Sequence, residues 1–174
     1  MRSSEVLVDG YDRVRGVVHR VIGGLDTDQL TARLEGRANP IGWLVWHLTR
    51  VQDDHLADVT GAEQVWTAQG WAGRFGLPYP VGATGYGHGP EEVAAFAVSS
   101  GELLTGYYDT VHAQTVDYVS GLTDTDLDRV VDPSWDPPVT LGVRLVSVLA
   151  DDLQHAGQAA YARGLLDARH TRDA

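Results

Sequence analysis

Apolar residues recur at helical intervals in four long stretches of the chain, and segments rich in glycine, proline and polar residues separate these stretches. The clearest stretch follows Asn39-Pro40, a typical helix start, and stops at Gly61. Its repeating residues are Leu44, His47, Leu48, Val51, His55 and Val59. At 100° per residue they share one stripe, about 120° wide, of the kind that faces a core. The pattern therefore predicts that His47 points inward.

Three further long helices are predicted, over about residues 4–24, 91–121 and 140–164, with short elements near 26–28 and 123–131. The proline-rich stretch 132–138 cannot lie inside a helix. No segment has a convincing strand pattern, and the 28 residues of 62–89 are too many for a simple hairpin loop. We therefore expect an all-α fold, a four-helix bundle with a long crossover connection.

The composition is that of an ordinary globular protein, and 174 residues suit a single domain over 1–174, with a core from about 5 to 166 and a polar tail. The net charge is −11 and basic patches are absent, which argues against nucleic-acid binding. No apolar run is long enough for a membrane span, and the first residues make a poor signal peptide. We expect no membrane association and a cytoplasmic protein.

The chain has no cysteine, so a metal could be held only by imidazole and carboxylate groups. Asp151 and His155 lie four residues apart on the last predicted helix, which brings two side chains within reach of one ion. Asp152 lies nearer the centre of the apolar arc. It is either an alternative ligand to Asp151 or an acid that orients a ligand histidine. His47 is the best third ligand, because His55 lies about 12 Å further along the same helix. Packed or solvated histidines remain the alternative interpretation.

Two segments resemble the signature segments of the DinB-like superfamily: Gly42-Trp43-Leu44-Val45-Trp46-His47-Leu48, and the run from Asp151 to Gln158. The similarity is greatest to the DUF664-type branch, near the mycothiol-dependent maleylpyruvate isomerase and thiol transferase N-terminal domains, and covers roughly residues 5–166. The resemblance implies a DinB-like/YfiT-like bundle of the metal-dependent hydrolase type. It also implies a divalent metal ion, zinc or alternatively nickel, on His47, Asp151 and His155. Many members have histidine where this chain has Asp151.

The resemblance further implies an enzyme that uses a low-molecular-weight thiol such as mycothiol for S-transfer to, or isomerisation of, a small electrophile. A metal with an open position binds a thiol and lowers its pKa, which yields a thiolate nucleophile. Gln158, and either Tyr86 or His88 from the long loop, are the candidates to line the pocket. Arg144 is a candidate partner for an anionic substrate group, with an ordinary surface arginine as the favoured alternative. The alternative function is a non-catalytic, stress-associated protein that binds a metal or ligand. A homodimer is expected for either function.

Overall fold

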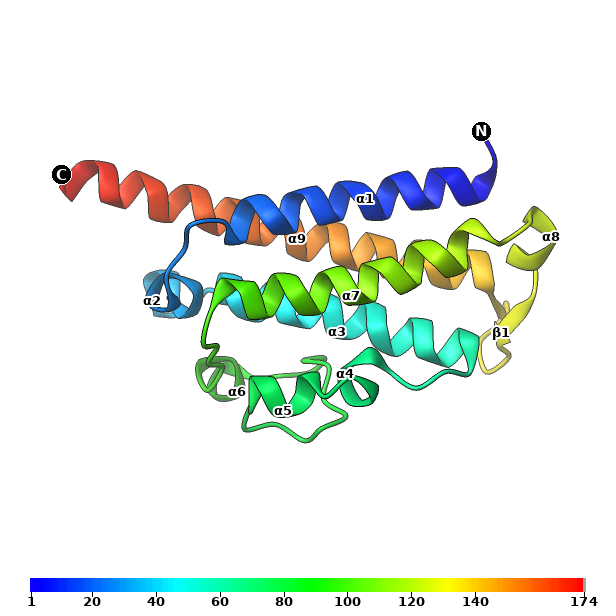
Figure 1. Ribbon diagram of the computed structural model, residues 1–174, viewed down its shortest axis with the longest axis horizontal. Helices are drawn as coiled ribbons and strands as arrows, with labels where there is room; N and C mark the ends of the chain where they lie inside the picture. Colours follow the sequence, from blue (N-terminus) through cyan, green and yellow to red (C-terminus); the bar gives the residue numbers. More distant parts are fainter. Residues whose placement is uncertain (174) are drawn as a thin grey trace.

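The computed structural model describes the backbone of residues 1–173 and the side chains of residues 1–169. Four long helices form a bundle: α1 (Ser3–Ile22), α3 (Ile41–Thr60), α7 (Gly101–Ser120) and α9 (Leu141–Asp173). α1 and α3 each pack against both α7 and α9, so α1 lies diagonally across from α3. α1 and α9 run in one direction and α3 and α7 in the opposite one (Figure 1). The prediction of an all-α bundle is confirmed.

The crossover connection joins α3 to α7, two parallel helices, and therefore has to return along the bundle (Figure 1). It contains three short helices, α4 (Val65–Ala68), α5 (Trp71–Phe75) and α6 (Pro90–Ala94). α3 stops at Gly61, whose positive φ of 71° lets its N–H reach the carbonyl of Ala57. The long connection predicted from the sequence is thus a crossover, as expected.

The other connections lie at the two ends of the bundle. α2 (Thr27–Thr31), capped by the carboxylate of Asp26, and the 3₁₀ turn η1 (Leu34–Gly36) link α1 to α3. α8 (Asp124–Leu127) and a small antiparallel hairpin of β1 (Val130–Asp132) and β2 (Val139–Thr140) link α7 to α9.

Three expectations about the elements are wrong in detail. The helix predicted over about 91–121 is two helices, because Ser100 accepts a hydrogen bond from the N–H of Leu103 and starts α7 anew. The hairpin was not expected, since its strands have only three and two residues. α9 runs past Gly164, its predicted end, to Asp173.

A buried polar network fastens the crossover to α3. The carboxylate of Asp53 accepts hydrogen bonds from the backbone N–H groups of Val65 and Trp66, both at 2.8 Å. The guanidinium of Arg50, whose side chain is 0% exposed, donates to Gln64 and to the carbonyl of Ala83. The loop that follows Ala83 is therefore held at a fixed height along α3.

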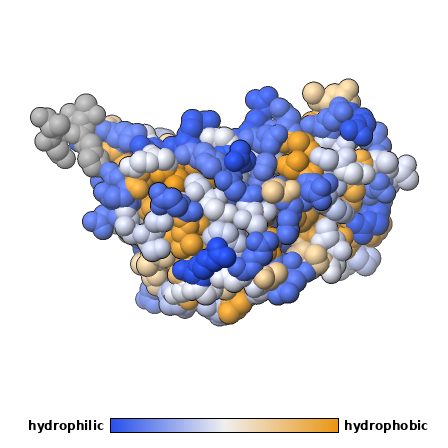
Figure 2. Space-filling model, in the orientation of Figure 1, coloured by the Kyte–Doolittle hydropathy of each residue, from blue (hydrophilic) through white to orange (hydrophobic). Residues whose placement is uncertain are grey.

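The apolar core fills the interior between the four helices and extends beneath the crossover, where tryptophan and tyrosine rings pack together. On the face seen in Figure 2, hydrophilic residues cover much of the surface and apolar patches lie between them. Within residues 1–173, no helix combines the length and apolar character needed to cross a membrane.

Candidate metal centre

Three side chains from two helices converge on one side of the bundle. His47 comes from the first half of α3, and Asp151 and His155 lie one turn apart on α9. One nitrogen or oxygen atom from each lies within 4.8 Å of the others. The two imidazole rings meet edge to face, with their centroids 4.7 Å apart. The structure thus brings together the three residues that the sequence singled out.

The crossover loop fixes the orientation of His47. Its Nδ1–H donates a 2.6 Å hydrogen bond to the carbonyl of Thr84, so Nε2 carries the free lone pair. Trp43 stacks on the ring at 4.8 Å between centroids. Gly85 packs over the same ring, and a Cβ there would lie 2.7 Å from Nδ1. The imidazole is therefore held in one tautomer and one position.

The other two members are held by α9 itself. Nδ1 of His155 donates a 3.0 Å hydrogen bond to Oε1 of Gln158, which leaves Nε2 facing Oδ1 of Asp151 at 3.6 Å. Oδ2 of Asp151 is inaccessible to solvent and has no hydrogen-bond partner among the described residues. A buried carboxylate oxygen without a partner is costly unless something else satisfies it.

Electrostatics set the protonation of the cluster. Burial lowers the pKa of His47, against the opposing effect of its bond to Thr84, and so favours the neutral imidazole. The adjacent carboxylate of Asp151 raises the pKa of His155, with burial opposing this effect and Gln158 adding to it. Burial acts to raise the pKa of Asp151, but His155 and the other nearby histidines, His47 and His55, hold it below its ordinary value. Asp151 is therefore an anion beside two imidazoles.

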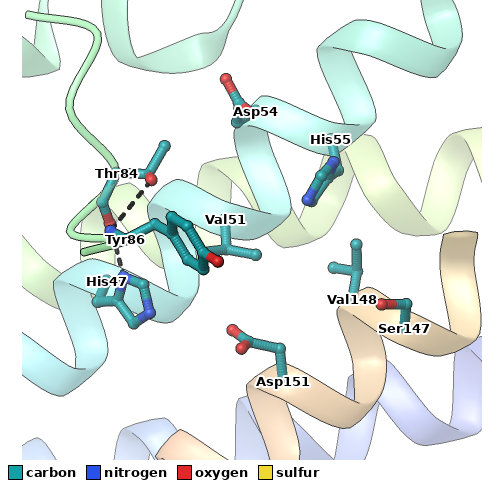
Figure 3. A pocket seen from close by; sticks show the side chains of 9 residues that line it. All are labelled: His47, Val51, Asp54, His55, Thr84, Tyr86, Ser147, Val148 and Asp151. Atoms are coloured by element: carbon teal, nitrogen blue, oxygen red, sulfur yellow. Dashed lines mark hydrogen bonds between the residues drawn. The ribbon is translucent and has the colours of Figure 1, made fainter. Parts of the chain in front are cut away.

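A cavity of about 400 Å³ opens beside His47 and Asp151, between α3 and α9 (Figure 3). Val51 and Val148 line its middle, and His55 points into it from α3 at the end away from His47. The remaining lining residues are Asp54, Thr84, Tyr86 and Ser147. A second hollow of about 590 Å³ shares Asp54 and His55 with the first, so the two adjoin.

The other residues named from the sequence lie in different places. Asp152 is fully buried, as its place in the apolar arc indicated, but it is outside the cluster and bonds to neither histidine. His88 packs among the rings of Trp43, Trp46 and Tyr79 and does not line the cavity.

Of the three remaining candidates, only Tyr86 lines the main cavity. Arg144 forms an ion pair with Asp132 and borders the second hollow. Gln158 orients His155 and lines a different groove. The loop therefore contributes Tyr86 rather than His88 to the cavity, and neither Gln158 nor Arg144 lines it.

Sequence reasoning missed two contributors. The carbonyl of Thr84 and the close approach of Gly85 depend on how a long loop folds back, and no local pattern signals that. His55 was excluded as a ligand because of its distance along the helix, and the cluster of His47, Asp151 and His155 indeed does not contain it. Its place on the apolar stripe with His47 nevertheless indicated that His55 faces the interior, where it lines the cavity.

The donor set fits a divalent metal ion. Ligand atoms about 2.0–2.2 Å from one ion lie within roughly 4 Å of each other. Small side-chain rotations would therefore bring one atom each of His47, Asp151 and His155 into contact with the same ion. The lone pair of His47 Nε2 is free, and the partnerless Oδ2 of Asp151 would gain a partner. Two imidazoles and one carboxylate suit zinc and related transition metals and leave positions open.

Comparison with known proteins agrees with this geometry. Residues 11–159 match the sequence profile of the DinB superfamily, a superfamily of helical and typically metal-binding proteins. The chain belongs to the DinB superfamily. Among solved structures, a conserved protein from Enterococcus faecalis superposes with a TM-score of 0.88 and 29% sequence identity, over 94% of this chain and 96% of the other. Comparison with curated proteins found no match.

Proposed function

We propose that this protein is a divalent-metal-dependent enzyme that uses a low-molecular-weight thiol, of the mycothiol kind, for S-transfer to or isomerisation of a small electrophile. The observation that carries the proposal is the convergence of His47, Asp151 and His155 at the wall of an open cavity. Zinc is the preferred ion and nickel the alternative. The thiol part rests on the resemblance to thiol-dependent DinB-like proteins of the DUF664-type branch.

A bound divalent ion supplies a Lewis acid that lowers the pKa of a coordinated thiol and so favours the thiolate. The chain has no cysteine of its own to compete for that position. His47, kept neutral by burial, would serve as a ligand without first losing a proton. Thr84 and Gln158 hold the two imidazoles so that each directs Nε2 to the common point.

The rest of the cavity suits a small, partly apolar substrate. Val51 and Val148 make its middle apolar. His55 has no hydrogen-bond partner among the described residues, and burial, followed by the charge of Arg144, lowers its pKa. A neutral imidazole with free nitrogens is suited to accept a proton from the reacting molecule and return it.

The test is turnover of a model reaction. Metal-loaded protein is incubated with mycothiol and a chloro-dinitro arene, and the product is followed by absorbance and mass spectrometry. In this reaction a C–S bond forms, the C–Cl bond breaks, and the thiol proton and chloride leave. We expect product with the native chain and with His112→Ala, a buried histidine away from the site, but none with His47→Ala.

The outcomes separate the candidate functions. Absence of product from the metal-loaded native chain contradicts the thiol-transfer proposal for this electrophile class. Tight mycothiol binding without product favours the alternative, a non-catalytic stress-associated protein that binds a metal or ligand.

A further inference from the structure

The outer face of α9 is unlike the other outer surfaces of the bundle. Between residues 141 and 166, none of its exposed residues is charged: Val143, Val146, Ser147, Ala150, Leu153, Gln154, Gly157, Gln158, Ala160, Tyr161, Gly164 and Leu165. Over a similar length, the exposed face of α1 includes Glu5, Asp9, Asp12, Arg13, Arg15 and Arg20. A solvated helix face is normally polar or charged. This face of α9 therefore has the composition of an interface.

The exposed apolar and small residues of α9 follow a heptad spacing. Intervals of three and four alternate without a break through Val143, Val146, Ala150, Leu153, Gly157, Ala160 and Gly164. This spacing is the a and d pattern of a helix that packs lengthwise against another helix. The seam is about 30 Å long. α9 packs on α1 and α3 through its opposite side, so the described fold leaves this seam free.

The glycines in the seam have no explanation within the chain. A Cβ at Gly157 or Gly164 would meet nothing within 4 Å, and neither residue has a positive φ. At Gly10 and Gly42, by contrast, a Cβ would lie 2.6 Å from Leu149 and 2.9 Å from the carbonyl of Leu30. Glycine weakens a helix interior. Glycines that face outward are useful where another helix approaches closely.

We propose that the seam of α9 is the contact between two copies of this chain, packed antiparallel about a two-fold axis. The larger side chains lie toward its start and the smaller ones toward its end, so an antiparallel copy sets large against small. One register pairs Val143 with Ala160, Val146 with Gly157 and Leu153 with Ala150. A parallel arrangement would instead stack valine on valine and glycine on glycine.

Charge also favours a second copy in this place. Two chains of net charge −11 repel one another, and the repulsion is smallest where both present an uncharged face. Roughly a dozen residues a side is fewer than the 20–30 of a standard interface. We therefore expect a dimer that dissociates on dilution. Ser147 lies beside Val146 and lines the metal cavity, so the second copy borders the mouth of that cavity.

The test is the mass in solution of the full chain, measured by sedimentation equilibrium over roughly micromolar to millimolar concentrations. We expect twice the 18.8 kDa of one chain at the upper end. Leu153→Glu places two acids close to the axis and should weaken dimerisation by at least about tenfold. Val6→Glu is the matched control, because Val6 is 54% exposed and Leu153 is 47% exposed.

Gly157→Leu separates association from folding. It adds a side chain in open space and improves helix propensity, so the melting temperature of the monomer should rise while dimerisation weakens. A monomer at every concentration would overturn the proposal. So would a dimer that Leu153→Glu leaves intact, or binding of this face to lipid vesicles without self-association.

Discussion

Replacing Gly85 with alanine tests how the crossover loop controls the metal centre. Gly85 has φ of +92°, and an added Cβ would lie 2.7 Å from Nδ1 of His47, 3.0 Å from Cζ3 of Trp46 and 3.1 Å from Cζ2 of Trp43. These rings are buried and cannot move far. The loop would therefore shift and weaken the hydrogen bond between Thr84 and His47.

The loss of stability in Gly85→Ala has two parts, backbone strain and a weakened hydrogen bond. A non-glycine residue at positive φ costs about 1–2 kcal/mol, and loss of the hydrogen bond to His47 adds about 0.5–1.5 kcal/mol. Loss of a group that orients a ligand typically lowers metal affinity about 10- to 100-fold. Gly87→Ala is the matched control, since Gly87 has φ of +76° and nothing within 4 Å of its Cβ position.

The assay is zinc affinity by competition with a chelator, together with the free energy of unfolding of the metal-free chain. We expect both glycine variants to lose stability through backbone strain, but only Gly85→Ala to lose metal affinity. Wild-type affinity in Gly85→Ala, or an equal loss in Gly87→Ala, would refute the link between loop and ligand.

Three further predictions concern single side chains. Burial raises the pKa of Asp152 well above its ordinary value, so the folded state holds its proton more tightly than the unfolded state and stability falls as pH rises above about 3.9. Asp152→Asn should therefore raise the melting temperature at neutral pH and have little effect near pH 3.9; an equal shift at both pH values would contradict this. Tyr107→Phe removes a hydroxyl that donates to Asp53 at 2.7 Å and should cost about 1.5–3 kcal/mol in urea unfolding, and a change below about 0.5 kcal/mol would argue against the network. His55→Gln should reduce turnover of the proposed thiol reaction while zinc affinity stays unchanged, and a parallel loss of zinc would mean that His55 acts on the metal site instead.

The long helices could be predicted because burial of one face leaves a periodic pattern. The stripe through Leu44 and His47 indicated the inward direction of His47 correctly, and the same angular counting placed Asp152 nearer the core than Asp151. The pattern could not separate α6 from α7, because Phe96 and Val98 continue the apolar sequence but are buried by a non-helical turn.

The supporting parts of the site could not be predicted in this way. The position of Thr84 depends on the buried bonds that Arg50 and Asp53 make to the crossover, which are contacts between residues distant in sequence. The position of His88 could not be predicted either, because it packs against Trp46 and Tyr79 beneath the loop and not in the cavity. Periodicity gives the face of a helix, whereas loop geometry follows from tertiary contacts.

The most direct test of the metal centre is the stoichiometry of zinc in the untagged chain, prepared without a nickel column and measured by elemental analysis after equilibration with zinc. Asp151→Asn and Asp152→Asn form a matched pair, because they make the same change in adjacent residues of α9. We expect one ion per chain in the native protein and in Asp152→Asn, and a substoichiometric amount in Asp151→Asn. A native chain without zinc, or equal loss in both variants, would contradict a centre built from His47, Asp151 and His155.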